Sequence, residues 1–185
     1  MLTNRAPRYP RGVTRFSLRN LRLRPGEEQH EQLELELGPL TLGGVIYEPT
    51  PSVVPAELVV QRAQSGDVFR LRFATRIEGP CMRCLDAAAV DVVVEAQEYE
   101  SVDADDADEL HSEYVVDGDL DVGAWAHDQV ALGLPEPILC RPDCAGLCPV
   151  CGKNLNDEPH LHEDVVTDPR WAALEALRGD ASDDG

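Results

Sequence analysis

The sequence lacks several features that would each indicate a class of function. It has no run of 18 apolar residues, so it predicts no membrane-spanning helix. It has no glycine-rich phosphate-binding loop and no internal repeat. Its first residues are basic and include no apolar stretch, so we expect no secretory signal and a cytoplasmic location. In that reducing compartment, its six cysteines are expected to be thiols or metal ligands rather than disulfides.

Basic residues are scarce outside the N-terminal segment. The formal net charge is −19, yet residues 1–24 contain seven arginines and no acid. Residues 100–121 carry ten acids and no lysine or arginine. Such an acidic body repels phosphate backbones and attracts basic proteins. We therefore expect a basic protein partner; the alternative is direct RNA contact through Arg5, Arg8, Arg11 and Arg15.

Hydrophobic periodicity predicts an α+β fold, with an antiparallel sheet followed by two short helices. Alternating apolar side chains predict strands over 33–37, 69–73 and 90–99, and the apolar run 58–60 predicts another. The last two strands are expected to form a hairpin with Cys81 and Cys84 at its tip.

The two expected helices flank a cysteine-rich segment. The first covers 120–132, is capped by Asp119 or Asp121, and has an apolar stripe of Val122, Trp125, Ala126 and Val130. The second begins at Asp168-Pro169 and has an apolar stripe of Trp171, Leu174 and Leu177. From these elements we predict a flexible basic arm (1–13), a sheet region (14–99), an acidic loop (100–118), one region containing both helices and the cysteine-rich segment (119–178), and a disordered acidic tail (179–185).

The sequence Cys148-Pro149-Val150-Cys151-Gly152 has the spacing of a zinc knuckle. Two thiolates in a C-x-x-C turn can face one metal ion. Pro149 stiffens the turn, and Gly152 permits the left-handed backbone that brings the chain back under the sulfurs. A closed zinc site needs four ligands, so the knuckle supplies half of one.

Eight candidate ligands form two groups of four. One is local: Cys148, Cys151, His160 and His162. The other joins the hairpin tip to the later segment: Cys81, Cys84, Cys140 and Cys144. We predict one or two structural zinc ions, and a single site drawn from the eight residues stays open.

Other interpretations of these residues are a thioredoxin-type redox pair at Cys81 and Cys84, or a hydrolytic zinc site with Glu158 or Glu163 near the histidines. No βαβ pattern surrounds the first pair, and four-cysteine sites leave no open position for catalysis. We therefore expect a non-enzymatic protein. His127 lies in the first expected helix and is predicted to be a surface or core residue rather than a ligand.

The cysteine motifs resemble those of the YceD family, bacterial and plastid proteins associated with accumulation of large-subunit ribosomal RNA. The resemblance rests on Cys81-x-Arg83-Cys84-Leu85, Leu134-Pro135, Cys140, the block from Cys144 to Asn156, and Asp168-Pro169-Arg170-Trp171. It spans roughly residues 14 to 178 and departs at His160 and His162, where many relatives carry Cys-x-Cys. Exchange of cysteine for histidine is what metal ligation tolerates. The resemblance implies a factor that supports large-subunit (23S) rRNA accumulation. Together with the acidic charge of the chain, this context makes a basic large-subunit ribosomal protein or assembly factor the expected partner.

Overall fold

The structure is a computed structural model that describes residues 15–101 and 110–162. These residues fall into two compact units, divided between Cys144 and Ala145. The first unit contains all the named strands and the helix. The second contains the zinc-knuckle sequence and a single isolated bridge between Leu147 and Asn154 among its described residues.

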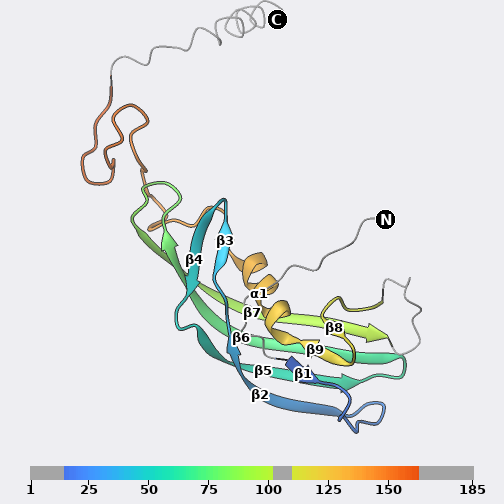
Figure 1. Ribbon diagram of the computed structural model, residues 1–185. Coiled ribbons are helices and arrows are strands. Elements are labelled where there is room, and N and C mark those ends of the chain that lie inside the picture. The colour runs from blue at the N-terminus through green and yellow to red at the C-terminus, as the bar shows by residue number, and fades with distance from the viewer. Residues whose placement is uncertain (1–14, 102–109, 163–185) are drawn as a thin grey trace, which may run out of the picture. The chain divides into compact units, whose positions relative to one another are not determined.

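The first unit is built on a six-stranded antiparallel sheet, which Figure 1 shows as a set of long strands side by side. Its strands are β2 (Glu28–Glu36), β3 (Leu40–Leu42), β4 (Val45–Pro49), β5 (Val53–Arg62), β6 (Gly66–Pro80) and β7 (Ala87–Ser101). The order is β2-β5-β6-β4-β3, and β7 pairs with the other edge of β6 along its whole length. β6 is therefore the central strand.

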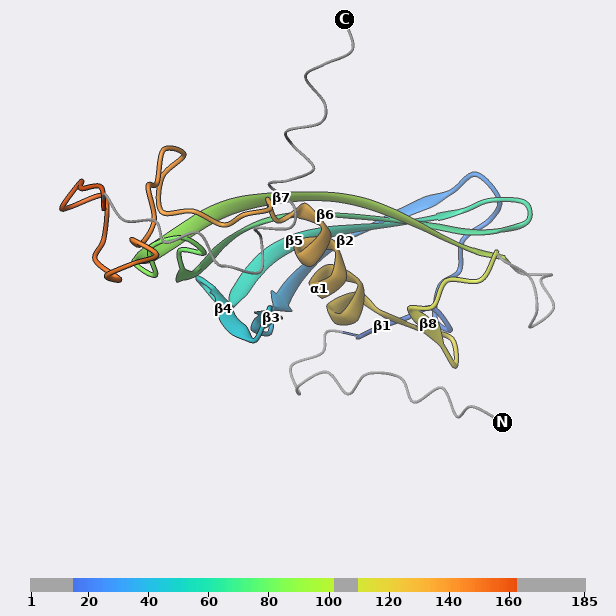
Figure 2. The ribbon, with the colours of Figure 1, turned by 90° about the horizontal axis from the view of Figure 1, so that it is seen from above.

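A smaller sheet and one helix complete the first unit. The small sheet has the order β1-β9-β8, from Arg15–Ser17, Asp119–Asp121 and Val115–Val116. The helix α1 (Val122–Gly133) follows β9 directly. Figure 2 shows α1, β1 and β8 on the same side of the large sheet, and α1 packs against β7. One face of the large sheet is thereby covered.

The core lies between this covered face and α1. Phe69, Leu71 and Phe73 alternate along β6 and are buried, whereas Arg70 is half-buried and Arg72 is exposed on the opposite face. Trp125 is fully buried in α1. Burial of each large apolar side chain stabilises the fold by about 1.5–3 kcal/mol, so this layer dominates the stability of the unit.

The predicted helix over 120–132 is confirmed. Asp121 is its N-cap, and the Asp121 carboxylate accepts a hydrogen bond from the Ala124 amide at 3.0 Å. This contact satisfies one of the amides that the first helical turn leaves without a backbone partner. The buried residues of α1 are those of the predicted stripe: Val122, Trp125, Ala126 and Val130.

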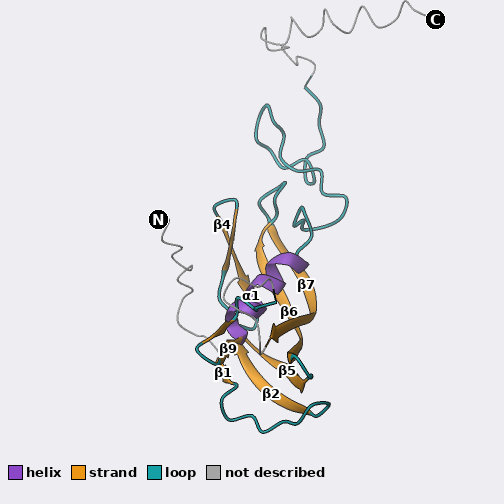
Figure 3. Ribbon diagram, turned by 90° about the vertical axis from the view of Figure 1, so that its right-hand side faces the viewer, coloured by secondary structure: helices purple, strands orange, loops and turns teal. Residues whose placement is uncertain are grey.

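The predicted α+β class is wrong. The described residues form mostly antiparallel β-sheet with a single helix, as Figure 3 shows. The second expected helix, at 168–178, lies outside the described residues. The error came from strands that the periodicity did not reveal. The first half of β2 is polar on both faces, and β3 and β9 are each only three residues long.

Gly79 lies where β6 passes closest to the buried ring of Tyr47. A Cβ at this position would lie 2.3 Å from Tyr47 Cδ1, and the Tyr47 hydroxyl donates a hydrogen bond to the Pro80 carbonyl at 3.0 Å. Gly79→Ala should therefore lower the free energy of unfolding by about 1–3 kcal/mol, measured by urea denaturation, because the ring is only 1% exposed and has no free space. Ala87→Ser, at an exposed site on the neighbouring strand, is the control and should change it by less than about 0.5 kcal/mol. An equal loss in both variants would contradict this close packing.

Candidate metal centres

The first cluster joins the tip of the β6–β7 hairpin to the segment that follows α1. Cys81 and Cys84 lie in the connection between β6 and β7, which confirms the predicted hairpin tip. Cys81 Sγ lies 3.7 Å from Cys144 Sγ, and Cys84 Sγ lies 3.5 Å from Cys140 Sγ. All four sulfurs lie within 4.8 Å of one another.

Backbone contacts dock the later segment onto the hairpin tip. The Met82 amide donates to the Ile138 carbonyl at 2.9 Å, and the side chain of Ile138 is buried. The Arg83 guanidinium donates to the Cys144 carbonyl at 2.9 Å. The first cluster is therefore held in place by hydrogen bonds and packing as well as by its thiols.

The surroundings of the first cluster shift the pKa values of Cys81, Cys84 and Cys140 in different directions. Burial alone would raise the pKa of Cys81, but the amides of Cys84, Arg83 and Cys140 hydrogen-bond to its sulfur and lower the pKa to about 6. Burial raises the pKa of Cys84 and of Cys140. At neutral pH the Cys81 thiolate is thus favoured, and burial opposes charge on Cys84 and Cys140 unless a cation is present.

The second cluster lies entirely in the second unit. Cys148 and Cys151 stand on the predicted turn, in which the Gly152 amide donates to the Cys148 carbonyl at 2.8 Å. Gly152 has φ of 74°, the left-handed conformation expected from the sequence. The ligand atoms of Cys148, Cys151, His160 and His162 lie within 4.8 Å of one another.

Hydrogen bonds orient His160 toward the thiols. Its Nδ1 lies 2.7 Å from the Glu158 carbonyl, so Nδ1 carries the proton and donates it. Nε2 is then directed at Cys151 Sγ, 3.1 Å away. The Glu158 carbonyl, and then the Cys148 side chain, raise the pKa of His160. This arrangement, with one ring nitrogen fixed by a carbonyl, is typical of metal-binding histidines.

Both clusters fit a tetrahedral metal ion. Sulfurs bonded to zinc at about 2.3 Å lie about 3.8 Å apart in a tetrahedron, close to the separations in the first cluster. These separations are far from the ~2.05 Å of a disulfide. All six cysteines lie in the described ranges, and none forms a disulfide. Each cluster can therefore hold a metal ion, and the two-group arrangement is the one that the structure brings together.

The two centres differ in burial. Cys81, Cys84 and Cys144 are buried and Cys140 is half-buried, whereas Cys151 and His162 are exposed. Of the acids considered for hydrolytic chemistry, Glu158 places its carboxylate 2.6 Å from Lys153 Nζ, and Glu163 lies outside the described residues. His127 lies on α1, outside both clusters.

The sequence of the chain matches the family described as "Large ribosomal RNA subunit accumulation protein YceD" over residues 69–178. The chain belongs to the YceD family. This match includes both metal centres and the β6–β7 hairpin from Phe69 onward. No solved structure matched the chain. Among the described residues, no helix is long and apolar enough to cross a membrane.

The relatives of this YceD-family chain include mycobacterial proteins. Uncharacterized proteins of Mycobacterium tuberculosis and Mycobacterium bovis are each 36% identical over 137 residues, which is 71% of this chain and 65% of theirs. An uncharacterized protein of Mycobacterium leprae is 45% identical over 62 residues, 33% of this chain and 28% of its own. The match thus spans about two thirds of the length of the Mycobacterium tuberculosis and Mycobacterium bovis proteins.

Proposed function

We propose that this protein is a non-enzymatic cytoplasmic factor that supports accumulation of large-subunit (23S) rRNA by binding a basic ribosomal protein or assembly factor. The observation that carries the proposal is the family match over residues 69–178, which encloses both cysteine clusters. In this proposal each cluster holds one structural zinc ion. Zinc would neutralise the buried thiolates and fix the chain around them, and the residues themselves provide the binding surface.

The charge of the chain supports a basic protein as partner. Outside residues 1–24 the chain carries 35 acids against 9 basic residues. Two arginines of the N-terminal segment are engaged by the protein itself: Arg15 Nε lies 3.6 Å from the Asp121 carboxylate, and Arg19 Nε donates to the Asp117 carbonyl at 2.9 Å. These contacts favour the protein partner over direct rRNA contact through Arg5, Arg8, Arg11 and Arg15, of which the first three lie outside the described residues.

Depletion of the protein in cells that carry its gene tests the cellular role. The ratio of 23S to 16S rRNA should fall on depletion and recover when the wild-type chain is restored. An unchanged ratio and normal large subunits would contradict the proposal.

A capture experiment tests the partner. The purified zinc-loaded chain should capture basic proteins from the total protein extracted from large subunits, and should bind naked 23S rRNA weakly. Strong rRNA binding lost on deletion of residues 1–24 would favour the RNA alternative.

The acidic run should accelerate association with the captured partner. Its residues 102–109 lie outside the described residues, and the prediction rests on their charge. Replacing Asp103, Asp105, Asp106, Asp108 and Glu109 with Asn or Gln should slow association on the order of tenfold at low ionic strength and leave dissociation little changed, as measured by stopped flow. Neutralising Asp180, Asp183 and Asp184 is the control for a general loss of charge. An unchanged association rate in the first variant would exclude steering by this run.

A further inference from the structure

Exposed apolar side chains gather at the end of the first unit that carries the hairpin tip. Val45 and Ile46 on β4 are 38% and 58% exposed, and Met82 and Leu85 in the β6–β7 connection are 43% and 66% exposed. Each of the four lines at least one of two hollows in the surface, and Leu85 lines both. Large exposed apolar side chains are usually scattered singly, and a group of them beside concave surface is typical of a binding site.

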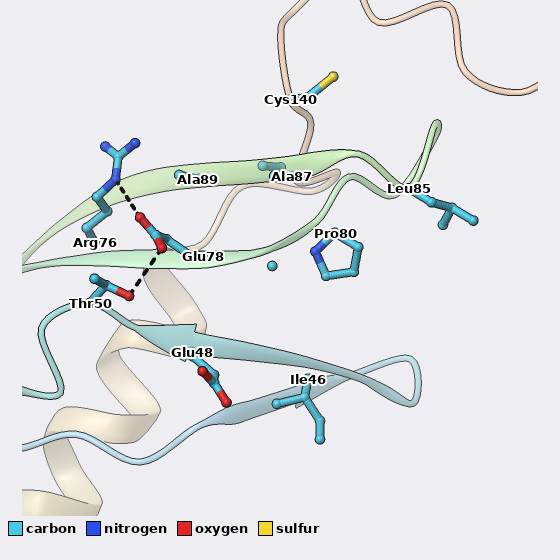
Figure 4. Close-up of a pocket in the computed structure, with 12 residues that line it drawn as sticks. Ile46, Glu48, Thr50, Arg76, Glu78, Pro80, Leu85, Ala87, Ala89 and Cys140 are labelled. Atoms are coloured by element: carbon cyan, nitrogen blue, oxygen red, sulfur yellow. Dashed lines mark hydrogen bonds and ion pairs between the residues drawn. The ribbon is translucent and has the colours of Figure 1, made fainter. Parts of the chain in front are cut away.

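The larger hollow exists because two hairpins separate. β4 pairs with β6 at only two positions, Glu48 with Glu78 and Pro49 with Ile77. Beyond these pairs the strands diverge and leave an opening of about 860 Å³. Figure 4 shows Ile46 and Glu48 on the β4 side of the opening, and Pro80 and Leu85 on the other side. The smaller hollow, about 550 Å³, lies between the β3–β4 hairpin and the end of α1. We call the two hollows together the forked groove.

Leu85 has a backbone conformation that its side chain does not favour. Its φ is 67°, in the left-handed region where a non-glycine residue costs about 1 kcal/mol or more. Its amide donates to the Cys81 carbonyl at 3.0 Å, which holds the turn in this shape. Asparagine or glycine would be less strained here. Because the leucine side chain is largely exposed, packing within the described chain does not explain it, whereas contact with a partner would.

Two carboxylates of the forked groove, Glu48 and Glu136, have no cation beside them among the described residues, whereas Glu78 is paired with Arg76. Glu48 lies directly across from Glu78 on paired strands, a destabilising arrangement of like charges. The Glu78 carboxylate lies 3.3 Å from Arg76 Nε, whereas Glu48 has no ion-pair or hydrogen-bond partner for its carboxylate in the described ranges. Glu136, which lines the smaller hollow, likewise has none within residues 15–101 and 110–162. Each hollow thus offers one carboxylate without a cation beside apolar side chains.

We propose that the forked groove docks an extended segment of a basic protein, with an apolar side chain against Leu85 and Ile46 and a lysine or arginine next to Glu48 or Glu136. The inference rests on the proposed function and names the docking surface for its partner. The carboxylates disfavour nucleic acid, and they disfavour the acidic body of a second copy of this chain. Residues 163–185 of the chain itself carry seven acids and two basic residues, so their charge does not complement the groove either.

The first metal centre lies next to this surface. Cys140 lines the larger hollow and Cys81 the smaller, and Leu85 follows Cys84 directly in the chain. The cysteine cluster therefore positions Leu85 by fixing the turn that carries it. This connection gives the buried cluster a role in recognition in addition to its role in stability.

Leu85→Asn tests the groove, because asparagine tolerates the left-handed backbone and removes the apolar side chain. We expect at least a tenfold weaker affinity for the protein captured from large subunits, with an unchanged or higher Tm. Val93→Thr, at a β7 position that is 75% exposed and lies outside both hollows, is the matched control and should bind as wild type. Glu48→Gln combined with Glu136→Gln should weaken binding and reduce its salt dependence.

A defined peptide locates the contact. A 12-residue peptide of alternating lysine and leucine should shift the amide resonances of Ile46, Glu48 and Leu85 in the ¹⁵N-labelled full chain, and a lysine–serine peptide of equal charge should shift them less. If Leu85→Asn and Val93→Thr both bind the partner as wild type does, docking in the forked groove is overturned and the proposed function stands. Absence of any capture by the wild-type chain would instead overturn the proposed function. Groove resonances that move when the chain alone is diluted would assign the groove to a second copy. Groove resonances that move in Trp171→Ala without peptide would assign it to the C-terminal segment. Either result would overturn the proposal.

Discussion

Cys84→Ser should reduce the zinc content of the purified chain from two equivalents to one and lower the free energy of unfolding of the first unit by about 3 kcal/mol or more. Cys84 is only 4% exposed, and its sulfur lies 3.5 Å from that of Cys140. Its loss removes one ligand and leaves three sulfurs, two of them buried, without the cation that neutralises them. Elemental analysis and denaturant unfolding followed by far-UV circular dichroism measure the two effects.

Cys151→Ser is the matched comparison, because the same substitution then falls in the second unit. Cys151 is exposed, and the segment that carries its cluster has few apolar residues. This variant should also lose one zinc equivalent, and the stability of the first unit should stay within about 0.5 kcal/mol of wild type. A wild-type chain that is folded, chelator-insensitive and far below one zinc equivalent would contradict the metal assignment. Equal destabilisation of the first unit by both variants would contradict the independence of the two centres.

Trp125→Ala should cost about 3–5 kcal/mol of stability, since the indole is fully buried between α1 and the sheet. The indole also stacks on Tyr114, with ring centroids 6.3 Å apart. Its Nε1 is buried and has no hydrogen-bond partner among the described residues. Trp125→Phe should therefore cost less, about 1–2 kcal/mol, because it leaves a smaller cavity and loses no hydrogen bond.

Leu132→Ala is the control on the same helix. Leu132 is 78% exposed, so its truncation should change the free energy of unfolding by less than about 0.5 kcal/mol. Urea denaturation at a fixed zinc concentration measures all three variants. A cost for Trp125→Phe as large as that for Trp125→Ala would show that the indole nitrogen has a partner that the packing does not reveal.

The parts of the fold that sequence reasoning predicted are those set by local pattern. The stripe from Val122 to Val130 repeats at helical spacing and buries the residues expected. The hairpin with Cys81 and Cys84 at its tip follows from two alternating runs separated by a turn. The two groups of ligands were also predictable, because each C-x-x-C pair needs two further ligands to close a site.

The fold class failed where strands are short or polar. Gly43 and Gly44 both have positive φ and form the two-residue turn between β3 and β4, and Asp117-Gly118 does the same between β8 and β9. Gly-Gly and Asp-Gly are recognised hairpin signals, so these strands could have been found. The pairing of Arg15 with Asp121 could not, because no local pattern specifies contacts between strands so distant in sequence. The forked groove likewise depends on where β4 leaves β6.

The span of the first metal centre has a consequence for the newly synthesised chain. Cys84 and Cys140 are 56 positions apart, and Cys81 and Cys144 are 63 apart. At a synthesis rate of about 5–20 residues per second, the hairpin thiols precede their partners by roughly 3 to 13 seconds. During that interval the nascent chain presents only two of the four sulfurs, which is too few to close a tetrahedral site. We therefore expect this centre to close only after α1 has been translated, so that acquisition of the ion marks a nearly complete first unit.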